Sequence, residues 1–276
     1  MARWLKRRGW MYAAMAVISL FALFPVYYVL ITSLKTRAEI YSRTPDLWPN
    51  HPNWHEFSSV LGEGHVARAL LNSLIVAGGT MVVCLIVGAL AAYALARFRM
   101  PFTRVLLMAV LMTQMFPLVV LVIPLFVLMR KADLLGTYWS LIITYLAFTV
   151  PLAIWVMRGF IMSIPEELEH AARIDGATRI GAMVRVVLPL AAPGLATTAV
   201  LSFLEGWKEF LLALTFLNDE SRKTVPLVLQ SFVGRGDVDW AAVMATSVLY
   251  TLPVAVVFVL LRKHLMTART AGAVKG

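Results

Sequence analysis

The chain has 276 residues, of which 60% are hydrophobic and only 14% are charged. An ordinary soluble domain is about half apolar and about one quarter charged, so this composition indicates insertion into a membrane. The net charge of +10 does not indicate nucleic-acid binding, because the Lys and Arg residues cluster between apolar runs instead of following one polar face.

The N-terminal segment is basic and leads into an apolar run, a pattern that could imitate a secretory signal. The run extends from Gly9 to Leu34 without a charged residue, and no small-residue cleavage pattern closes it. It is long enough to cross a bilayer. We therefore expect a retained first transmembrane helix over residues 10–33, followed by an extramembrane loop that contains Trp48 and Trp54.

Five further apolar segments follow, and together they predict an all-α polytopic membrane protein, one transmembrane domain over residues 1–276 with six spans. Backbone groups in lipid must be satisfied within the segment, and no alternating strand pattern is present, so the spans are expected to be helices. Gln114, Pro117 and Pro124 mark the third span as a candidate kinked helix facing a pathway. The remaining predicted spans are 70–96, 105–129, 136–158, 194–217 and 241–262.

Basic residues in the connecting segments predict the orientation. With the N-terminus inside, fifteen Lys and Arg residues lie in cytoplasmic segments and nine lie in external ones. The segment from Arg97 to Arg104 has three arginines and no acidic residue. We therefore expect both termini inside, which also places the loop between the fourth and fifth spans in the cytoplasm.

That cytoplasmic loop, residues 163–190, has the pattern of a helix-turn-helix hairpin. Pro165 at a first helical position, followed by three glutamates, is a favourable helix start. Gly176 allows the chain to reverse, and Thr178 can cap a second helix that runs to Leu188. By pattern alone, an amphipathic hairpin lying on the membrane surface is an equal alternative.

The residues of this loop match a known signature. Ala171-Ala172-Arg-Ile-Asp175-Gly176-Ala177, with Leu188-Pro189 twelve residues after Gly176, closely resembles the "EAA" coupling loop of ABC importer permeases. The resemblance extends along nearly the whole chain. The chain looks like the carbohydrate branch of the family and is similar in detail to the smaller permease subunit of maltose- and trehalose-type importers. The other matching segments are Asn72-Ser73-Leu74, Ala91-Ala-Tyr93-Ala-Leu-Ala-Arg97-Phe, Met115-Phe-Pro117, Gly206-Trp207-Lys-Glu209-Phe and the tail from Thr270 to Gly276.

The resemblance implies a sugar importer in a bacterial or archaeal cytoplasmic membrane. This chain would pair with a second permease, two ATPase subunits that bind ATP and Mg, and an external solute-binding protein. The chain itself would bind no cofactor. The implied ATPase-coupling residues are Glu169, His170, Ala171, Ala172, Asp175, Gly176, Ala177, Leu188 and Pro189, and the implied tail contacts to the ATPase are Thr270, Gly272, Lys275 and Gly276.

One position departs from the family pattern. Glu usually precedes the two alanines and is expected to pair with a basic ATPase residue, but this chain has His170 there. Glu169 lies about 100° away around a helix and is not a simple substitute. Either His170 hydrogen-bonds instead, which would make coupling weakly pH dependent, or the position tolerates any polar residue of this size.

The fifth span carries charged residues, which usually face a bundle interior or a water-filled path. Glu205, Lys208 and Glu209 have i, i+3, i+4 spacing and so lie on one side of a helix. Gly206 gives a close-approach point, and the ring of Trp207 would suit stacking on a sugar. A polar clamp between helices explains the same pattern equally well. The candidate pathway residues are Gln114, Phe203, Glu205, Trp207, Lys208 and Glu209.

Motifs of catalytic and metal-binding proteins are missing from the sequence. No Gly is followed directly by Lys, so the chain has no Walker A loop and is not the ATPase. His51 and His55 have helical ligand spacing, but Pro52 separates them and no Glu follows His51, so no metal site is expected. The alternatives that remain are an ABC permease for another polar solute such as a glycerol phosphodiester, a secondary transporter, and a membrane enzyme.

Overall fold

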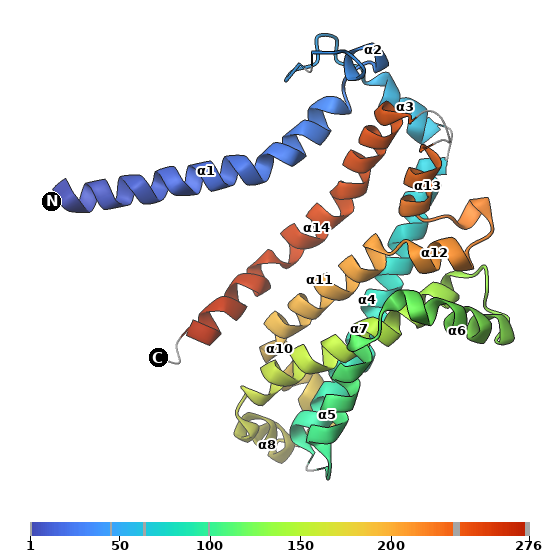
Figure 1. Cartoon of the computed structure of the whole chain (residues 1–276). Helices are drawn as coiled ribbons and strands as arrows, with labels where there is room; N and C mark the ends of the chain where they lie inside the picture. Colours follow the sequence, from blue (N-terminus) through green and yellow to red (C-terminus); the bar gives the residue numbers. More distant parts are fainter. Residues whose placement is uncertain (1, 45, 63–64, 99, 234–237, 274–276) are drawn as a thin grey trace. The chain divides into compact units, whose positions relative to one another are not determined.

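The computed structural model describes residues 2–44, 46–62, 65–98, 100–233 and 238–273, and every regular element in these ranges is a helix (Figure 1). Four helical segments are long and apolar enough to cross a membrane by themselves. They are Gly9–Thr32 in α1 (Ala2–Thr32), α4 (His65–Arg97), α7 (Tyr138–Met162) and Trp240–Leu265 in α14 (Trp240–Ala273). The expected all-α architecture is confirmed for the described residues.

The third predicted span is broken into two helices. The first piece consists of α5 (Thr103–Met112) and the short helix η1 (Thr113–Met115), and the second is α6 (Leu118–Lys131). The two pieces are bent by 99°. Pro117 lacks a donor N–H and forces the residue before it into an extended conformation, as seen at Phe116 with ψ of 125°. The predicted third span, 105–129, is thus divided into two helices at this proline instead of continuing as one kinked helix.

The fifth predicted span is also not one helix. α11 (Ala192–Lys208) ends where Glu209 adopts an extended conformation, and α12 (Leu211–Phe216) follows it. On its other side, α11 is bent by 80° from the segment Arg179–Leu190. The described residues therefore contain up to six spans if each of the two bent pairs crosses the membrane as one.

The chain divides into two compact units, residues 1–67 with 228–252 and residues 68–227 with 253–276. In the second unit α7 is the central helix, with 56% of its apolar window buried, against 33% for α4. The core surrounds α7 in two clusters. The first comprises Val76, Met129, Leu141, Ile142, Tyr145, Leu212, Ala213, Phe216, Leu217 and Leu227, and the second Ala89, Ala92, Tyr93, Met157, Ile161, Ile164, Met183, Val187 and Ala191.

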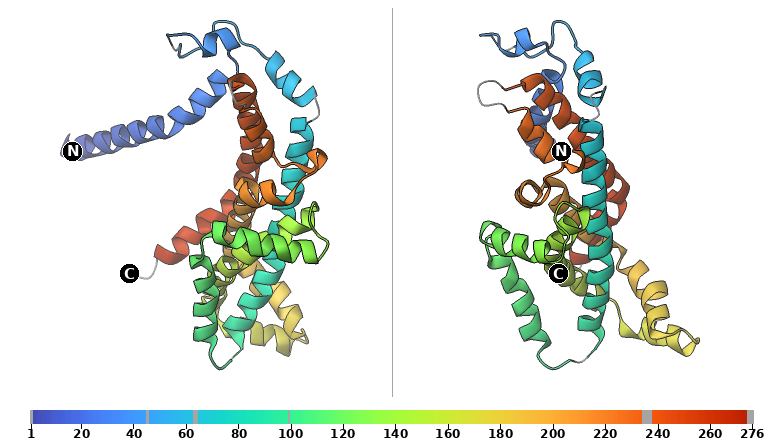
Figure 2. Two further views of the ribbon diagram at one scale, coloured as in Figure 1. Left: turned by 45° about the vertical axis from the view of Figure 1, so that its right-hand side comes forward. Right: turned by 90° about the vertical axis from the view of Figure 1, so that its right-hand side faces the viewer.

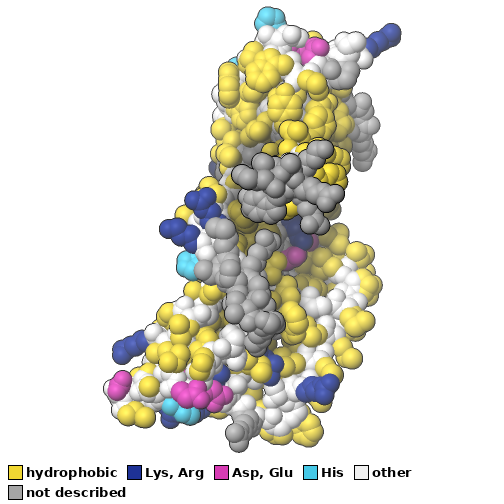
Figure 3. All heavy atoms as spheres, turned by 90° about the vertical axis from the view of Figure 1, so that its left-hand side faces the viewer, with side chains coloured by type: hydrophobic (Ala, Val, Ile, Leu, Met, Phe, Trp, Pro, Cys, Tyr) yellow, Lys and Arg dark blue, Asp and Glu magenta, His cyan; other side chains and the backbone are white. Residues whose placement is uncertain are grey.

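Apolar side chains also dominate the surface. Hydrophobic side chains fill much of the upper described part of the face drawn in Figure 3, and charged side chains lie mainly in its lower half. α1 exposes large hydrophobic residues along its length, including Phe21, which is 83% exposed. A surface of this kind requires lipid or another membrane protein to cover it, since soluble monomers rarely expose contiguous apolar patches of this extent.

In the first unit, the segment after α1 folds on itself. α2 (Arg37–Ile40) begins with a capping box in which Thr36 and Glu39 exchange hydrogen bonds, and α3 (His55–Gly62) follows after a loop. The backbone N–H groups of Asn50 and His51 also donate to Glu39, at 2.9 and 3.3 Å. These donors, first among them the backbone N–H of Thr36, lower the pKa of Glu39. Within the described ranges, no group of three potential ligands could hold a metal ion.

In the second unit, the segment before α13 (Val225–Ser231) is fastened to the start of α4. The amide nitrogen of Asn72 donates to the carbonyls of Ser221 and Lys223 at 3.0 and 2.8 Å, around the short helix η3 (Glu220–Arg222). Tyr138 donates to the amide oxygen of Asn72 at 2.7 Å, and the hydroxyl of Ser73 accepts from the N–H of Val225 at 2.9 Å. The Asn72–Ser73 pair thus ties this segment to the end of the α4–α7 pair at which both helices begin.

Candidate functional site

The predicted hairpin is present, at one end of α4 (Figure 2). α8 (Glu166–Ile174) follows Pro165, which occupies the N-cap position, one residue before the predicted one, and makes no side-chain capping hydrogen bond. Gly176 reverses the chain at a φ of +91°, a conformation that glycine adopts without a steric penalty. Thr178 accepts a hydrogen bond from the N–H of Gly181 at 3.0 Å, as its capping role predicts. The second leg comprises α9 (Arg179–Ala182), the π-helical η2 (Met183–Val187) and α10 (Leu188–Leu190).

The side of the hairpin that faces away from the rest of the protein carries most of the predicted coupling residues. His170, Ala171, Asp175, Gly176 and Pro189 are exposed, whereas Ala172, Ala177 and Leu188 are half-buried. Around them, the hairpin presents large apolar side chains to the outside. These are Leu168, Ile174, Ile180 and Val184, of which Ile174 is 86% exposed. An exposed apolar patch among polar residues is typical of a protein interaction surface.

Glu169 is the exception, because its side chain points into the protein. The hydroxyl of Tyr93 donates to one carboxylate oxygen, and Nε of Arg97 donates to the other at 3.1 Å. Arg97 also donates to the carbonyl of Ile164 at 2.9 Å and lies 3.8 Å from the carboxylate of Glu166. Sequence reasoning grouped Glu169 with the outward residues. The 100° offset between neighbouring helical positions was the signal that separated it from His170.

The second leg of the hairpin rests on the same end of α4. The guanidinium of Arg179 lies 4.5 Å from the ring centre of Phe98, and that ring meets Tyr93 edge to face at 6.4 Å. Met183 and Val187 are buried in the second core cluster, which Tyr93 also joins. Both legs of the hairpin are therefore attached to residues 93–98.

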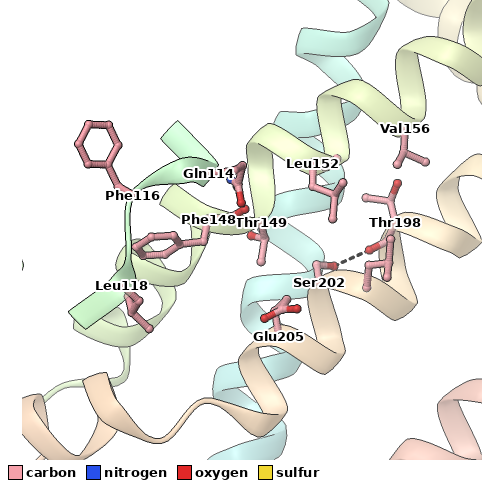
Figure 4. Close-up of a pocket in the computed structure, with 12 residues that line it drawn as sticks. Gln114, Phe116, Leu118, Phe148, Thr149, Leu152, Val156, Thr198, Ser202 and Glu205 are labelled. Carbon is pink, nitrogen blue, oxygen red and sulfur yellow. Dashed lines mark hydrogen bonds between the residues drawn. The ribbon is translucent and has the colours of Figure 1, made fainter. Parts of the chain in front are cut away.

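A pocket of about 290 Å³ lies between the broken third span, α7 and α11 (Figure 4). It brings together Gln114 and Glu205, two of the predicted pathway residues. The amide of Gln114 donates to the carbonyl of Phe148 at 2.8 Å, which fixes its orientation at the rim. The buried hydroxyl of Thr198 has no hydrogen-bond partner among the described residues. The lining residues are Gln114, Phe116, Leu118, Phe148, Thr149, Leu152, Ala153, Val156, Thr198, Leu201, Ser202 and Glu205.

The other predicted pathway residues are not among those that line this pocket. Trp207 and Phe203 stack on each other with ring centres 5.3 Å apart, and each is 2% exposed. The sequence suggested the ring of Trp207 for stacking on a sugar, with packing between helices as the equal alternative; in this structure the ring is packed in the interior against Phe203. Lys208 is exposed and pairs with Glu205 at 2.9 Å.

The spacing predicted that Glu205, Lys208 and Glu209 share one helix face. Glu209 does not, because α11 ends before it. Its carboxylate accepts hydrogen bonds from the N–H groups of Leu212 and Ala213 at 2.8 and 3.1 Å, and so caps α12. The hydroxyl of Tyr145 donates to it at 2.7 Å. The close approach expected at Gly206 is confirmed, since a Cβ there would lie 3.2 Å from Cα of Ala77.

The predicted tail contacts are not placed by the structure. Thr270 and Gly272 belong to α14, but no contact of either residue is described, and Lys275 and Gly276 lie outside the described residues.

Comparisons with known proteins give the same family along nearly the entire chain. The sulfoquinovosyl glycerol transport system permease protein SmoH of Agrobacterium fabrum is 36% identical over 265 residues, 96% of this chain and 93% of that protein. The diacetylchitobiose uptake system permease protein DasC of Streptomyces coelicolor is 34% identical over 276 residues, 100% of both proteins. The trehalose transport system permease protein SugB of Mycobacterium tuberculosis is 35% identical over 93% of both proteins.

Among solved structures, the fold is similar to a chain in the crystal structure of a bacterial ABC transporter involved in import of the acidic polysaccharide alginate. The TM-score is 0.79 at 25% identity, over 94% of this chain and 96% of that one. The family model of the binding-protein-dependent transport system inner membrane component matches residues 84–269, a region that contains the hairpin and the pocket. The chain therefore belongs to the binding-protein-dependent transport system inner membrane components, the permease family of ABC importers.

Proposed function

We propose that the chain is one permease subunit of an ATP-driven importer that carries a sugar, specifically a di- or oligosaccharide, across the cytoplasmic membrane. The observation that carries the proposal is the hairpin with its exposed apolar outer side, in a chain whose relatives are named for trehalose and diacetylchitobiose transport. The family comprises non-catalytic transport subunits, so ATP hydrolysis takes place in partner subunits that hold ATP and Mg. A secondary transporter or a membrane enzyme is not favoured.

The full assembly that we propose has a second permease, two ATPase subunits and an external solute-binding protein. The almost uncovered α1 and α14 support a membrane partner for this chain. A solved alginate transporter of the same fold, with a TM-score of 0.67 at 16% identity, was crystallised in complex with its periplasmic protein. With both termini inside, the hairpin faces the cytoplasm and can bind an ATPase, and the residues of the tail extend that contact.

The pocket between α7 and α11 is the proposed wall of the translocation path. The backbone at Phe116 and Pro117 is not helical, and non-helical backbone at membrane depth is tolerated where it is buried in protein or lines a water-filled cavity. Hydroxyl and amide groups from Thr149, Thr198 and Gln114 offer the donors and acceptors that a sugar requires. Phe203, Trp207 and Glu209 do not line the pocket, and in this proposal they pack the helices that do.

ATP dependence tests the importer function. The complete transporter is reconstituted in vesicles with the binding protein, and uptake of a labelled saccharide is measured with and without the ATPase subunits. We expect uptake only when the ATPase and ATP are both present. Uptake driven by an ion gradient alone would refute the proposal.

The docking role of the hairpin is tested at its turn. In Gly176→Pro, the ring would demand a φ near −65° where the chain has +91°, so the turn must rearrange. We expect the variant to insert and assemble but to lose the link between hydrolysis and uptake. Gly159→Ala is the matched control, since a Cβ there meets nothing within 4 Å. Unchanged coupled transport in Gly176→Pro would contradict docking.

A further inference from the structure

The most completely buried charged cluster of the described residues lies where the hairpin meets α4. The side chains of Arg97 and Glu169 are each 6% exposed, and Tyr93 is 5% exposed. Both carboxylate oxygens of Glu169 are occupied, one by Tyr93 and the other by Arg97 at 3.1 Å. Each of the other five ion pairs in the described ranges has at least one clearly exposed partner. One of these five is the contact that Arg97 itself makes with Glu166.

Because the Arg97–Glu169 pair is buried, it stabilises the hairpin only while both partners are present. A buried ion pair is tolerated when hydrogen bonds complete it, and removing one partner strands a charge away from water. A second guanidinium nitrogen of Arg97, Nη2, donates to the carbonyl of Ile164 just before α8. The start and the middle of α8 are therefore fixed to one arginine of α4.

At two points along its length, α4 is in turn closely packed against the two helices that line the pocket. A Cβ at Gly88 would lie 2.8 Å from Cβ of Ala153 in α7, and a Cβ at Gly206 in α11 would lie 3.2 Å from Cα of Ala77. Contacts this close leave little room for sliding, because the gap is smaller than one methyl group. A displacement of α4 is thus passed to α7 and α11.

We propose that Tyr93, Arg97 and Glu169 form an internal latch, which makes the coupling hairpin move as one body with α4. Force applied to the exposed side of the hairpin then reaches the pocket helices through this ion pair. All three are positioning residues, and Glu169 serves the latch and not the ATPase surface. The inference rests on the proposed function, since it requires an ATPase to act on the hairpin.

The latch predicts a specific defect in coupling. Glu169→Gln, Tyr93→Phe and the double variant R97M/E169M are prepared in the complete reconstituted transporter, and saccharide uptake and ATP hydrolysis are measured in the same vesicles. We expect uptake per ATP to fall about tenfold in Glu169→Gln and in the double variant, within the usual range for coupling between sites. We expect a smaller fall in Tyr93→Phe, which loses only the hydroxyl.

The double variant separates transmission from stability. It leaves no stranded charge, so it should assemble and melt like the wild-type complex even if Glu169→Gln does not. Its uptake per ATP should nevertheless stay low. Arg104→Met, an exposed arginine at the same end of the protein, is the matched control and should keep the wild-type ratio.

A wild-type ratio in R97M/E169M would overturn the latch, because packing alone would then carry the motion. An equal loss of ratio in Arg104→Met would overturn it too, since any lost charge would then suffice. These results differ from a failure of the proposed function, in which the wild-type complex itself shows no ATP-dependent uptake.

Discussion

The contact between α4 and α7 at Gly88 permits a quantitative prediction. The Cβ added by Gly88→Ala would lie 2.8 Å from Cβ of Ala153, whereas carbon atoms prefer a separation of about 3.5–4.0 Å. Neither methyl group can rotate away, so the two helices must separate. Overpacking of this kind costs about 1–3 kcal/mol.

A second glycine of α4 isolates that cost. A Cβ at Gly78 meets nothing within 4 Å, so Gly78→Ala changes only the helix propensity. Alanine is favoured over glycine by about 1 kcal/mol in a helix, and this gain is common to both variants. The difference between Gly88→Ala and Gly78→Ala is therefore the clash itself, about 1–3 kcal/mol.

Thermal unfolding of the purified complex measures this difference. For a chain of this size, each kcal/mol shifts the midpoint by about 2–4 °C, so Gly88→Ala should melt about 2–12 °C below Gly78→Ala. G88A/A153G moves the methyl group across the contact and should return close to wild type. Equal midpoints for the two single variants would refute the close packing of α4 on α7.

Three further predictions concern single polar groups. Glu209→Gln weakens the cap of α12 and should lower stability by about 1–2 kcal/mol, measured as a lower unfolding midpoint, whereas an unchanged midpoint would contradict the cap. Asn72→Ala should speed proteolytic cleavage within 218–224, because it removes two hydrogen bonds to that segment; cleavage at the wild-type rate would show that the segment is held otherwise. Because the pKa of Glu39 is lowered in the folded protein, its ionised carboxylate stabilises the fold at pH values above the ordinary carboxyl pKa. This stabilisation is lost as the pH falls through the lowered pKa, so the His51 amide should lose its protection from hydrogen exchange in acid. Glu39→Gln should lack this pH-dependent loss.

The sequence predicted features that depend on local chemistry. Gly176 and Thr178 act at a turn and a cap, where a few neighbouring residues decide the conformation, and both have the expected roles. Apolar windows likewise predicted helices, because lipid imposes internally satisfied backbone on any spanning segment.

Features that depend on contacts distant in sequence were not predictable. The carboxylate of Glu169 turns inward because Arg97, 72 residues earlier, lies opposite it. The end of α11 at Lys208 is stabilised by Glu209, which finds donors in α12 and in Tyr145 instead of continuing the helix. The prediction from side-chain periodicity required an unbroken helix, and it therefore placed Glu209 incorrectly on the same helix face as Glu205 and Lys208.

The clamp at Asn72 has a consequence for how the protein is made. Its two carbonyl partners follow 149 and 151 residues later in the chain. At a synthesis rate of about 5–20 residues per second, they emerge roughly 7–30 s after Asn72. During that interval only Tyr138, 66 residues downstream, becomes available to its amide. The contacts at the start of α4 are thus completed late in translation, after synthesis has passed α13, and a chain that stops earlier leaves that amide without its final partners.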